Sequence, residues 1–489
     1  MDAHPKPAMT IAASASVRLR EINELPGPRG LPLVGNLLQV RMGRMHQTIE
    51  RWADEYGPFF RFELGGRRFL GVADHEAVAA ILRERPGTFR RSLRMDEIWR
   101  EIGLDQGVFG ANGDAWRGQR RMVMAGFDPS HVRDFSPQLV AVAQRLQRRW
   151  QRAARAAQAI DLKADLTRFT VDAIAGLAFG TDVNTLESDS DVIQHHLDKI
   201  YPAIFRRAMS LVPYWRYVRL PSDWRLQRSV AAVNAGVNGF IANARHRLAC
   251  QPGLRERPRN LLEAMLVAAD QPGSGLTDRD VAGNVLTMLL AGEDTTANTL
   301  SWLVYLLARN PQALRHAQDE VRRVAGEGPA SFTLEQMASL DYVEACLHET
   351  MRLKPVVPFH TYQALQDTTV ADIQVSPDMV ICTVMRHDGM AERYFPDPLR
   401  FDPQRWLGTG GTWQTTRSAK RVSMPFGGGP RICPGRYLAL LEMKMATAML
   451  LGSFDIESVT TPGGREAEEH ASFAMEPVGL RMRLRERAT

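Results

Sequence analysis

The sequence predicts a mostly α-helical fold with a minor β component, an α+β domain. Three observations support this class. Helical patterns fill nearly all of residues 114–355, short strand-like runs lie on either side of that tract, and no repeat or linker interrupts the chain. We therefore expect a flexible N-terminal tail at residues 1–24 and a single domain at residues 25–489.

The N-terminal part combines a stiff lead-in, a helix and two strands. Residues 25–35, LPGPRGLPLVG, contain prolines and glycines that direct the chain without forming an element. A helical pattern follows at 45–56. Strand-like runs come next at 59–64 and 68–72, and Gly65-Gly66 between them predicts a hairpin turn.

The central tract contains the longest predicted helix. It begins at Thr277, a helix cap followed by acidic residues in the first turn, and ends at Asn310-Pro311. At about 1.5 Å per residue such a helix would cross the whole domain. Beyond Pro355 the sequence predicts short strands and turns, including 379–384, then a proline-rich stretch and a helix at 434–451.

The composition is that of a soluble globular protein, with 44% apolar and 24% charged residues. Cys250, Cys346, Cys382 and Cys433 are far apart and form no CxxC pair. This argues against a disulfide scaffold and a cysteine-rich zinc site, and it favours a reducing, cytoplasmic location. No stretch reaches the roughly 18 apolar residues of a membrane span. The N-terminal residues form neither a signal peptide nor an anchor.

The net charge is +6, and one basic segment is prominent. Its residues are Arg145, Arg148, Arg149, Arg152 and Arg155. Their spacing places them on one helix face, for which a solvated surface is the preferred interpretation. An acidic protein partner is the sharper alternative. Nucleic acid is a weak alternative because no nucleic-acid-binding module accompanies the segment.

The most informative segment is the loop Phe426-Gly-Gly-Gly-Pro-Arg-Ile-Cys433-Pro-Gly435. A thiolate is a strong ligand for a soft metal, and glycines let a flat cofactor lie against the main chain. Backbone N–H groups near the sulfur would tune its charge, and Arg431 would reach an acidic group at the cofactor's edge. The loop therefore predicts that Cys433 binds the iron of a flat cofactor.

The middle of the long helix carries polar residues in apolar surroundings. The segment Ala291-Gly-Glu-Asp-Thr-Thr296 is flanked by leucine-rich sequence, where buried polar groups must be paired or hydrated. Asp294 and Thr295 would suit a proton-delivery groove, with the threonine hydroxyl bonded back to a carbonyl. The alternative is a helix whose polar residues contact surrounding loops.

Three further sets are ambiguous by themselves. Glu349 and Arg352 share a helix face, where a surface ion pair is the more common arrangement. Trp116 and Arg120 can both donate to a carboxylate, or they belong to an ordinary amphipathic helix. Arg405 lies between aromatic residues in a proline-rich meander and needs an acidic partner, for which Glu349 is the candidate.

Taken together, the order and spacing of these motifs resemble the cytochrome P-450 superfamily of haem-thiolate monooxygenases over residues 25–485. The resemblance implies a triangular, helix-rich prism with a long central helix and small β-sheets. The loop motif of the family is matched by Phe426, Gly429, Arg431, Cys433, Gly435, Ala439 and Glu442. Its central-helix motif is matched by Ala291, Gly292, Asp294 and Thr295.

The resemblance implies a haem b cofactor with Cys433 as its axial ligand, and O₂ as co-substrate. The residues implied for cofactor binding are Trp116, Arg120, Phe426, Gly429, Arg431, Cys433 and Gly435. It also implies proton delivery by Thr295 with Asp294, and a buried structural triad of Glu349, Arg352 and Arg405.

Two departures from the family pattern stand out. Many relatives carry a propionate-binding arginine in the stretch that corresponds to residues 358–363, where this sequence has none. Tyr362 or His360 could donate instead, or Arg120 and Arg431 alone could hold that propionate. The membrane anchor of eukaryotic members is also missing, which favours a soluble, bacterial-type, stand-alone haem domain.

The implied activity is a haem-dependent monooxygenase that hydroxylates or epoxidises a lipophilic small molecule. Because no flavin, nicotinamide or iron–sulfur motif is found, we expect electrons from a separate ferredoxin- or flavodoxin-type donor with its NAD(P)H reductase. Arg117, Arg121 and Lys444 are candidates for its docking face. We expect a cytoplasmic monomer that binds no nucleic acid.

Substrate contacts are expected at Leu290, Ala291, Val357, Phe359 and His360. The segment 204–217 is either a mobile lid or ordinary helix packing. Two rival functions remain: isomerisation, dehydration or peroxide-driven chemistry in the same fold, and a non-catalytic haem sensor or carrier.

Overall fold

The computed structural model describes residues 18–188, 192–210, 212–325, 332–408 and 419–487. Helices dominate it, and the predicted fold class is confirmed. The α-helices are α1 (Met45–Tyr56), α2 (His75–Arg83), α3 (Leu93–Ile102), α4 (Gly113–Gly126), α5 (Pro129–Arg155), α6 (Leu162–Phe179), α7 (Val192–Met209), α8 (Pro221–Cys250), α9 (Gly253–Glu256), α10 (Leu261–Ala269), α11 (Asp278–Arg309), α12 (Pro311–Ala325), α13 (Leu334–Ala338), α14 (Asp341–Leu353) and α16 (Arg436–Ser453). The 3-10 helices include η1 (Ile22–Glu24), η4 (Tyr214–Arg216), η6 (Pro403–Trp406) and η7 (Gly429–Arg431).

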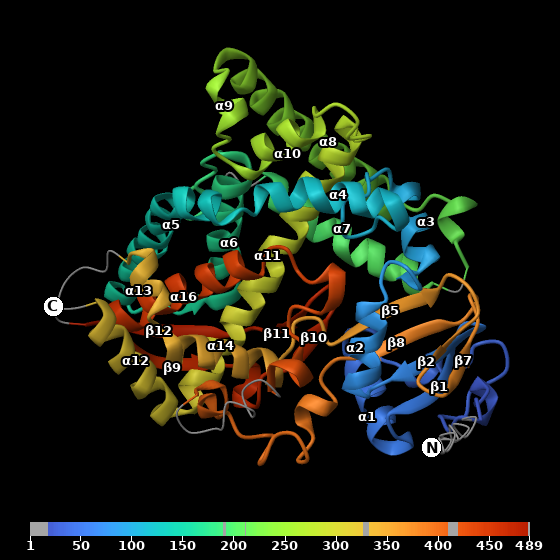
Figure 1. Ribbon diagram of the computed structural model, residues 1–489. Helices are drawn as coiled ribbons and strands as arrows, with labels where there is room; N and C mark the ends of the chain where they lie inside the picture. Colours follow the sequence, from blue (N-terminus) through green and yellow to red (C-terminus); the bar gives the residue numbers. More distant parts are fainter. Residues whose placement is uncertain (1–17, 189–191, 211, 326–331, 409–418, 488–489) are drawn as a thin grey trace, which may run out of the picture.

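The strands are short and lie mainly near the two ends of the chain. They are β1 (Phe59–Leu64), β2 (Arg67–Val72), β3 (Phe89–Arg91), β4 (Ile160–Asp161), β5 (Phe359–Ala364), β6 (Thr368–Val370), β7 (Ile373–Val375), β8 (Val380–Val384), β9 (Phe454–Thr460), β10 (Glu469–Ala471), β11 (Met475–Pro477) and β12 (Arg481–Glu486). The outline in Figure 1 is roughly triangular, with α8, α9 and α10 at its apex and the sheet of β1 and β2 at one lower corner.

The largest sheet joins distant parts of the chain. Its strand order is β1-β2-β8-β5-β3. β1 and β2 form the predicted hairpin, with Leu64 opposite Arg67 across the Gly65-Gly66 turn. β2 then pairs in parallel with β8, where Phe69 lies opposite Val380. The sheet therefore holds the N-terminal strands against the segment that follows α14.

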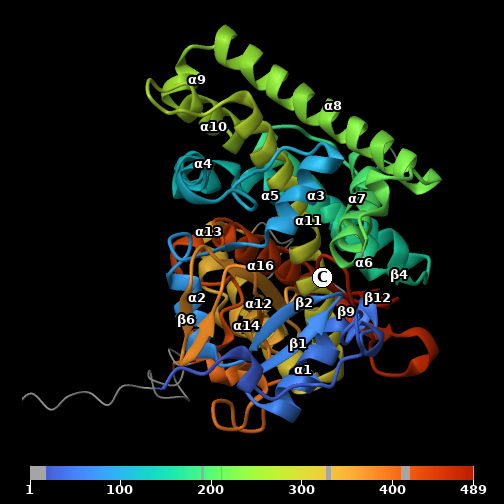
Figure 2. The ribbon, with the colours of Figure 1, turned by 90° about the vertical axis from the view of Figure 1, so that its right-hand side faces the viewer.

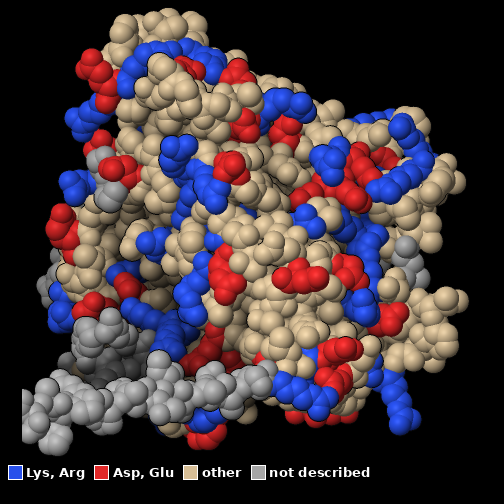
Figure 3. Space-filling model, turned by 45° about the vertical axis from the view of Figure 1, so that its right-hand side comes forward, with Lys and Arg blue, Asp and Glu red and all other residues tan. Residues whose placement is uncertain are grey.

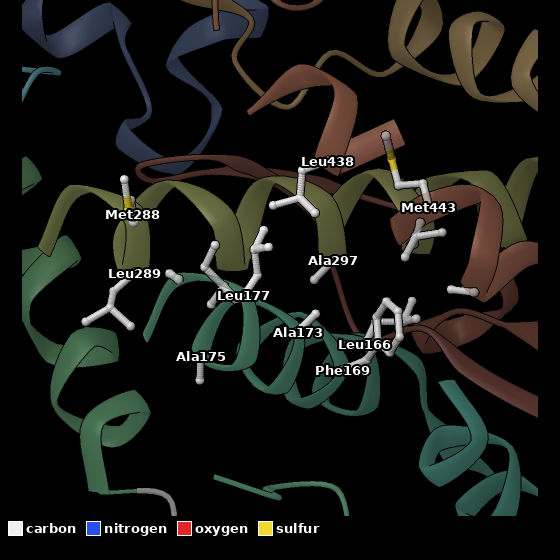
Figure 4. Close-up of a cluster of buried hydrophobic side chains, with 14 of the residues drawn as sticks. Leu166, Phe169, Ala173, Ala175, Leu177, Met288, Leu289, Ala297, Leu438 and Met443 are labelled. Atoms are coloured by element: carbon white, nitrogen blue, oxygen red, sulfur yellow. The ribbon is translucent and has the colours of Figure 1, made fainter. Parts of the chain in front are cut away.

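Helix α11 is the centre of the fold. Its cap is the predicted one: Thr277 accepts from the N–H of Asp280, and the Asp280 carboxylate accepts from the Thr277 N–H at 2.8 Å. Figure 4 shows the helix lying along α6, with Ala297 close to Ala173 and with Leu438 and Met443 of α16 alongside. In Figure 2, α11 runs down from α10 toward the strands.

A glycine of α11, Gly292, lies against α6. A Cβ at Gly292 would lie 3.1 Å from the Ile174 side chain of α6, and the Thr170 hydroxyl donates to the Glu293 carbonyl at 3.1 Å. A larger residue would push α6 away from the centre of α11. Gly292 therefore allows α6 to pack closely against this part of α11.

Four of the five arginines of the basic segment on α5 form ion pairs with acidic neighbours. These ion pairs are Arg145–Asp182 at 2.5 Å, Arg148–Glu187 at 2.9 Å, Arg149–Asp165 at 2.8 Å and Arg155–Glu486 at 3.0 Å. Acidic and basic side chains also lie side by side on the face shown in Figure 3. These contacts favour a solvated helix face over a docking surface for an acidic partner.

The first described residues are attached to the rest of the protein. Arg20 forms an ion pair with Asp372 at 2.7 Å, and Ile22 is buried. Residues 1–17 of the predicted tail lie outside the described residues. Among the helices that the structure describes, none is long and apolar enough to cross a membrane.

Candidate cofactor site

The loop that carries Cys433 wraps its backbone around the sulfur. It lies between η7 and α16, and the Cys433 N–H donates to the Phe426 carbonyl at 3.0 Å. Burial raises the pKa of the Cys433 thiol, while the Gly435 N–H and the Arg120 guanidinium act in the opposite direction. The loop therefore holds the sulfur of a half-buried cysteine beside donors that favour its thiolate form.

Gly429 lets this loop approach α2. Its φ is +65°, and a Cβ there would lie 2.2 Å from the carbonyl oxygen of Leu82. No other residue fits such a contact without moving backbone. Gly427 also has a positive φ, +73°, but a Cβ there would meet nothing within 4 Å.

Trp116 and Arg120 of α4 lie next to this loop. The Arg120 guanidinium donates to the Ile432 carbonyl at 2.9 Å, and the Arg431 guanidinium lies 5.1 Å from the centre of the Trp116 ring. Arg431 also donates through Nη2 to the carbonyls of Val108 at 2.9 Å and Ala111 at 2.7 Å. The structure thus brings these three predicted residues together.

Two arginines that the sequence reasoning missed lie in the same region. Arg85 follows α2, and its guanidinium stacks 4.3 Å above the Tyr362 ring. Arg91 on β3 lies 3.5 Å from the centre of the Phe109 ring and donates to the Phe109 carbonyl at 2.6 Å. The signal was present in the segment RERPGTFRR at 83–91, which carries four arginines and one acidic residue.

These arginines influence one another electrostatically. Burial, followed by the charges of Arg85 and Arg91, lowers the pKa of Arg431 to about 8. Burial and then Arg85 lower the pKa of Arg91 to about 9. Burial lowers the pKa of His360 to about 3, with further contributions from Arg91 and Arg85. The region is therefore rich in positive charge that its own residues do not neutralise.

The donor set fits haem. Among the described residues, Nε and Nη2 of Arg85 and Nη1 of Arg431 are buried without a hydrogen-bond partner. Buried cationic donors in this state are compatible with an anionic ligand, and haem carries two carboxylates at one edge. Cys433 supplies a sulfur for its iron. Cys433 can therefore bind the haem iron, and Arg85 and Arg431 can bind the haem carboxylates.

Helix α11 is α-helical across its central motif, with Thr295 bonded back to the helix. The Thr295 hydroxyl donates to the Ala291 carbonyl at 2.7 Å. Ala291 is exposed although most of α11 is buried, and Thr295, one turn later, lies on the same side. Burial raises the pKa of Asp294, and the positive charge of Lys163 opposes this effect.

Glu349, Arg352 and Arg405 meet in a buried network. Glu349 and Arg352 have fully buried side chains and are joined by bonds of 2.7 Å and 2.8 Å. Arg405 donates to Glu349 at 3.3 Å. Two donors that the sequence reasoning did not assign, the Asp402 N–H at 3.0 Å and the Trp406 indole at 2.9 Å, complete the set.

The proposed substrate residues divide into two groups. Leu290 is buried in the core, whereas Ala291 is exposed on α11. Phe359 and His360 lie on β5 opposite Val384 and Thr383, and Val357 precedes them. A groove near β5 is lined by apolar side chains such as Phe69 and Met95 and by polar ones such as Arg94, and none of the predicted substrate residues lines it.

The connection between α7 and α8 is attached to α3. The Trp215 indole donates to Glu101 at 2.6 Å, and Arg216 donates to the same carboxylate at 2.6 Å. Arg207 and Asp223 form a buried ion pair at 2.8 Å beneath Trp215. The described residues of the segment 204–217 are therefore bonded to α3 and α8.

Comparison with known proteins identifies the architecture. Residues 25–483 match the sequence profile of cytochrome P450, also spelled cytochrome P-450. The chain belongs to the cytochrome P-450 family. A self-sufficient cytochrome P-450 monooxygenase from Oidiodendron maius is 29% identical over 440 residues, which cover 88% of this chain and 39% of that protein.

Other relatives of this cytochrome P-450 have the same organisation. A bifunctional cytochrome P-450/NADPH–P-450 reductase from Acremonium egyptiacum is 28% identical, covering 88% of this chain and 40% of its own length. A self-sufficient enzyme from Aspergillus niger is 26% identical, covering 95% and 43%. The chain therefore spans about two fifths of the length of these relatives, all of which are fungal.

The comparisons correct one expectation. The prediction of a separate ferredoxin- or flavodoxin-type donor is wrong, because these relatives are self-sufficient or bifunctional enzymes. Of the residues expected at the docking face, Lys444 is buried and bonded to Glu344 at 2.8 Å, whereas Arg117, which pairs with Asp114, and Arg121 are exposed. The expectation of a bacterial-type, stand-alone enzyme gains no support from these fungal relatives.

Proposed function

We propose that this cytochrome P-450 binds haem b through Cys433 and oxygenates a lipophilic small molecule. The observation that carries the proposal is the half-buried Cys433 beside the N–H of Gly435, with buried, unpaired arginine donors of Arg85 and Arg431 nearby. The four cysteines are free, which supports a reducing, cytoplasmic location. The haem-binding unit is one domain over residues 25–489.

The bound haem iron supplies the chemistry that activates O₂ and inserts one oxygen atom into the substrate. Thr295 holds a hydroxyl proton at Oγ1 on the exposed side of α11, anchored by its bond to the Ala291 carbonyl. The raised pKa of Asp294 lets its carboxyl group exchange protons closer to neutral pH than an exposed aspartate does. The presence of both Asp294 and Thr295 favours oxygen activation over isomerisation or dehydration.

The names of the relatives support a reductase as the electron source. One of them is named as a fusion with an NADPH–P-450 reductase. We propose that the electrons for this haem domain come from NADPH through a reductase of that kind. Ala291 is exposed on α11, and a lipophilic molecule is expected as the substrate beside it.

The decisive measurement is the carbon monoxide difference spectrum of the reduced protein. Thiolate ligation gives a Soret band at about 450 nm, whereas loss of the thiolate gives about 420 nm. Cys433→Ser should abolish the band at the longer wavelength, and Cys250→Ser, at an exposed cysteine, should retain it. A native protein without that band would refute the proposal. Product formation with NADPH and a reductase then tests the oxygenase step.

A further inference from the structure

We infer that Arg85, positioned by Tyr362, binds one haem carboxylate and replaces the arginine that β5 lacks. The inference rests on the proposed haem site and assigns to it a residue that no motif identifies. Tyr362 lies in the stretch of β5 where many relatives carry that arginine. Here the positive charge comes from another segment, the turn after α2, and the tyrosine supports it from beneath.

The surroundings of Arg85 show an incomplete set of partners. The residue is 4% exposed. Its Nη1 donates to the Tyr362 hydroxyl at 3.2 Å, and the guanidinium lies 4.3 Å from the ring centre. Nε and Nη2 are buried and have no partner among the described residues. These two donors lie in one plane in a fork that matches the geometry of a carboxylate.

No acidic side chain forms an ion pair with Arg85 in the described part of the chain. Its neighbours include Arg91, Arg431 and His360, all of which are linked to it electrostatically. Asp96 is the acidic group recorded near Arg91 and Arg431, and burial raises its pKa to about 6. Arg85, Arg91 and Arg431 around one weak acid form an excess of positive charge, which a dianionic ligand would balance.

The other two arginines approach the ligand from different elements. Arg431 donates through Nη2 to the carbonyls of Val108 and Ala111, and its Nη1 has no partner among the described residues. Arg120 donates to the carbonyl of Ile432, which precedes Cys433. Arg85 lies beside β5 rather than α4. We therefore assign Arg85 to one carboxylate and Arg431, with Arg120, to the other.

Tyr362 acts as a positioning residue. It is 1% exposed, and its ring and its hydroxyl both contact the guanidinium. The stacking fixes the plane of the guanidinium, and the Tyr362 hydroxyl accepts a hydrogen bond from Nη1. Nε and Nη2 can therefore donate to the haem carboxylate. Tyr362→Phe keeps the stacking and removes only the hydrogen bond.

The experiment uses the purified holoenzyme. Haem dissociation is measured by transfer to a haem-scavenging apoprotein, and the reduction potential is measured by spectroelectrochemistry. Arg85→Gln should accelerate haem loss by about 10- to 100-fold, the worth of one buried charge-assisted hydrogen bond. It should also lower the reduction potential, because a positive charge near the iron is removed. Arg85→Lys should restore most of the potential, and Tyr362→Phe should accelerate haem loss a few-fold.

Arg207→Gln is the matched control, since Arg207 is also buried but pairs with Asp223 on a different element. It should lower the unfolding midpoint and leave the reduction potential unchanged. An Arg85→Gln variant with native haem loss and native potential would overturn the inference while leaving the proposed function intact. If Arg85→Gln does not accumulate as folded protein, Tyr362→Phe decides: changed haem loss supports the inference, and unchanged haem loss rejects it. A native protein without the band at about 450 nm would instead defeat the proposed function itself.

Discussion

Replacing Glu349 with glutamine should destabilise the protein by about 3–5 kcal/mol, the cost of breaking a buried ion pair from one side. The Glu349 carboxylate is fully buried and accepts from N–H groups of Arg352, Asp402, Arg405 and Trp406. Glutamine has the same size, but it removes the negative charge and turns an NH₂ group toward donors that need an acceptor.

The remaining cation explains the magnitude. Arg352 is fully buried, and it also holds the carbonyls of Gly389 at 2.6 Å and Pro398 at 2.8 Å. Without the carboxylate its charge stays buried and uncompensated, and the meander loses its attachment to α14. A domain has about 5–15 kcal/mol of stability in total, so the variant should lose a large fraction of it.

The assay is urea unfolding of the holoenzyme, followed by tryptophan fluorescence and by the carbon monoxide difference spectrum. Glu76→Gln is the control, because Glu76 on α2 forms an exposed ion pair with Arg421 at 2.7 Å. That change should cost about 0–1 kcal/mol. A Glu349→Gln protein that loses less than about 1 kcal/mol and keeps its haem spectrum would refute the reasoning.

Three further outcomes are expected. Gly429→Ala should abolish the band at about 450 nm, because its Cβ would collide with a carbonyl of α2 and displace the cysteine loop. Thr295→Ala should keep that band but release peroxide and lose coupled product, because the Thr295 hydroxyl, the proposed proton donor on α11, is removed. Although burial alone would raise it, hydrogen bonds from His46 and Arg386 hold the pKa of Glu469 well below its ordinary value of 4.5. The ionised Glu469 carboxylate stabilises the folded protein fully above pH 4.5, and this contribution falls progressively as the pH drops below 4.5. Glu469→Gln should therefore flatten the decrease of the urea midpoint between about pH 5 and pH 3.

Each outcome has a control within the chain. Gly427→Ala shares the positive φ but meets no neighbour within 4 Å, so it should cost only the local backbone strain and keep the spectrum. Thr299→Ala removes the same kind of back-bonded hydroxyl one turn away. Equal loss of spectrum in both glycine variants, full coupling in Thr295→Ala, or an unchanged acid profile in Glu469→Gln would contradict the respective argument.

The sequence predicted the elements that depend on local chemistry. The hairpin at Gly65-Gly66, the helix at 45–56 and the cap at Thr277 are short-range features, and the structure contains them. The second strand begins at Arg67, one residue earlier than expected, and the last helix spans Arg436–Ser453 rather than 434–451. Such differences arise at element ends, where hydrogen bonding and not composition decides the boundary.

Long-range partners were beyond local patterns. Arg85 becomes notable only because the chain brings Tyr362 beneath it, across 277 positions. Lys444 was expected at a docking face, but the packing of α16 buries it beside Glu344. The partners of the α5 arginines, Asp182 and Glu187, also come from outside that helix. Tertiary packing thus decided which charges are available to a ligand or partner.

The parallel pairing of β2 with β8 determines when the largest sheet can form during synthesis. The two strands are roughly 300 residues apart in the chain. At a translation rate of about 5–20 residues per second, β2 waits roughly 15–60 s before its neighbour leaves the ribosome. During that interval the β1–β2 hairpin exposes an unpaired edge, the kind of surface that promotes association between nascent chains. When fewer nascent chains are present at one time, this exposed edge should therefore find fewer partners, and the yield of folded protein should rise.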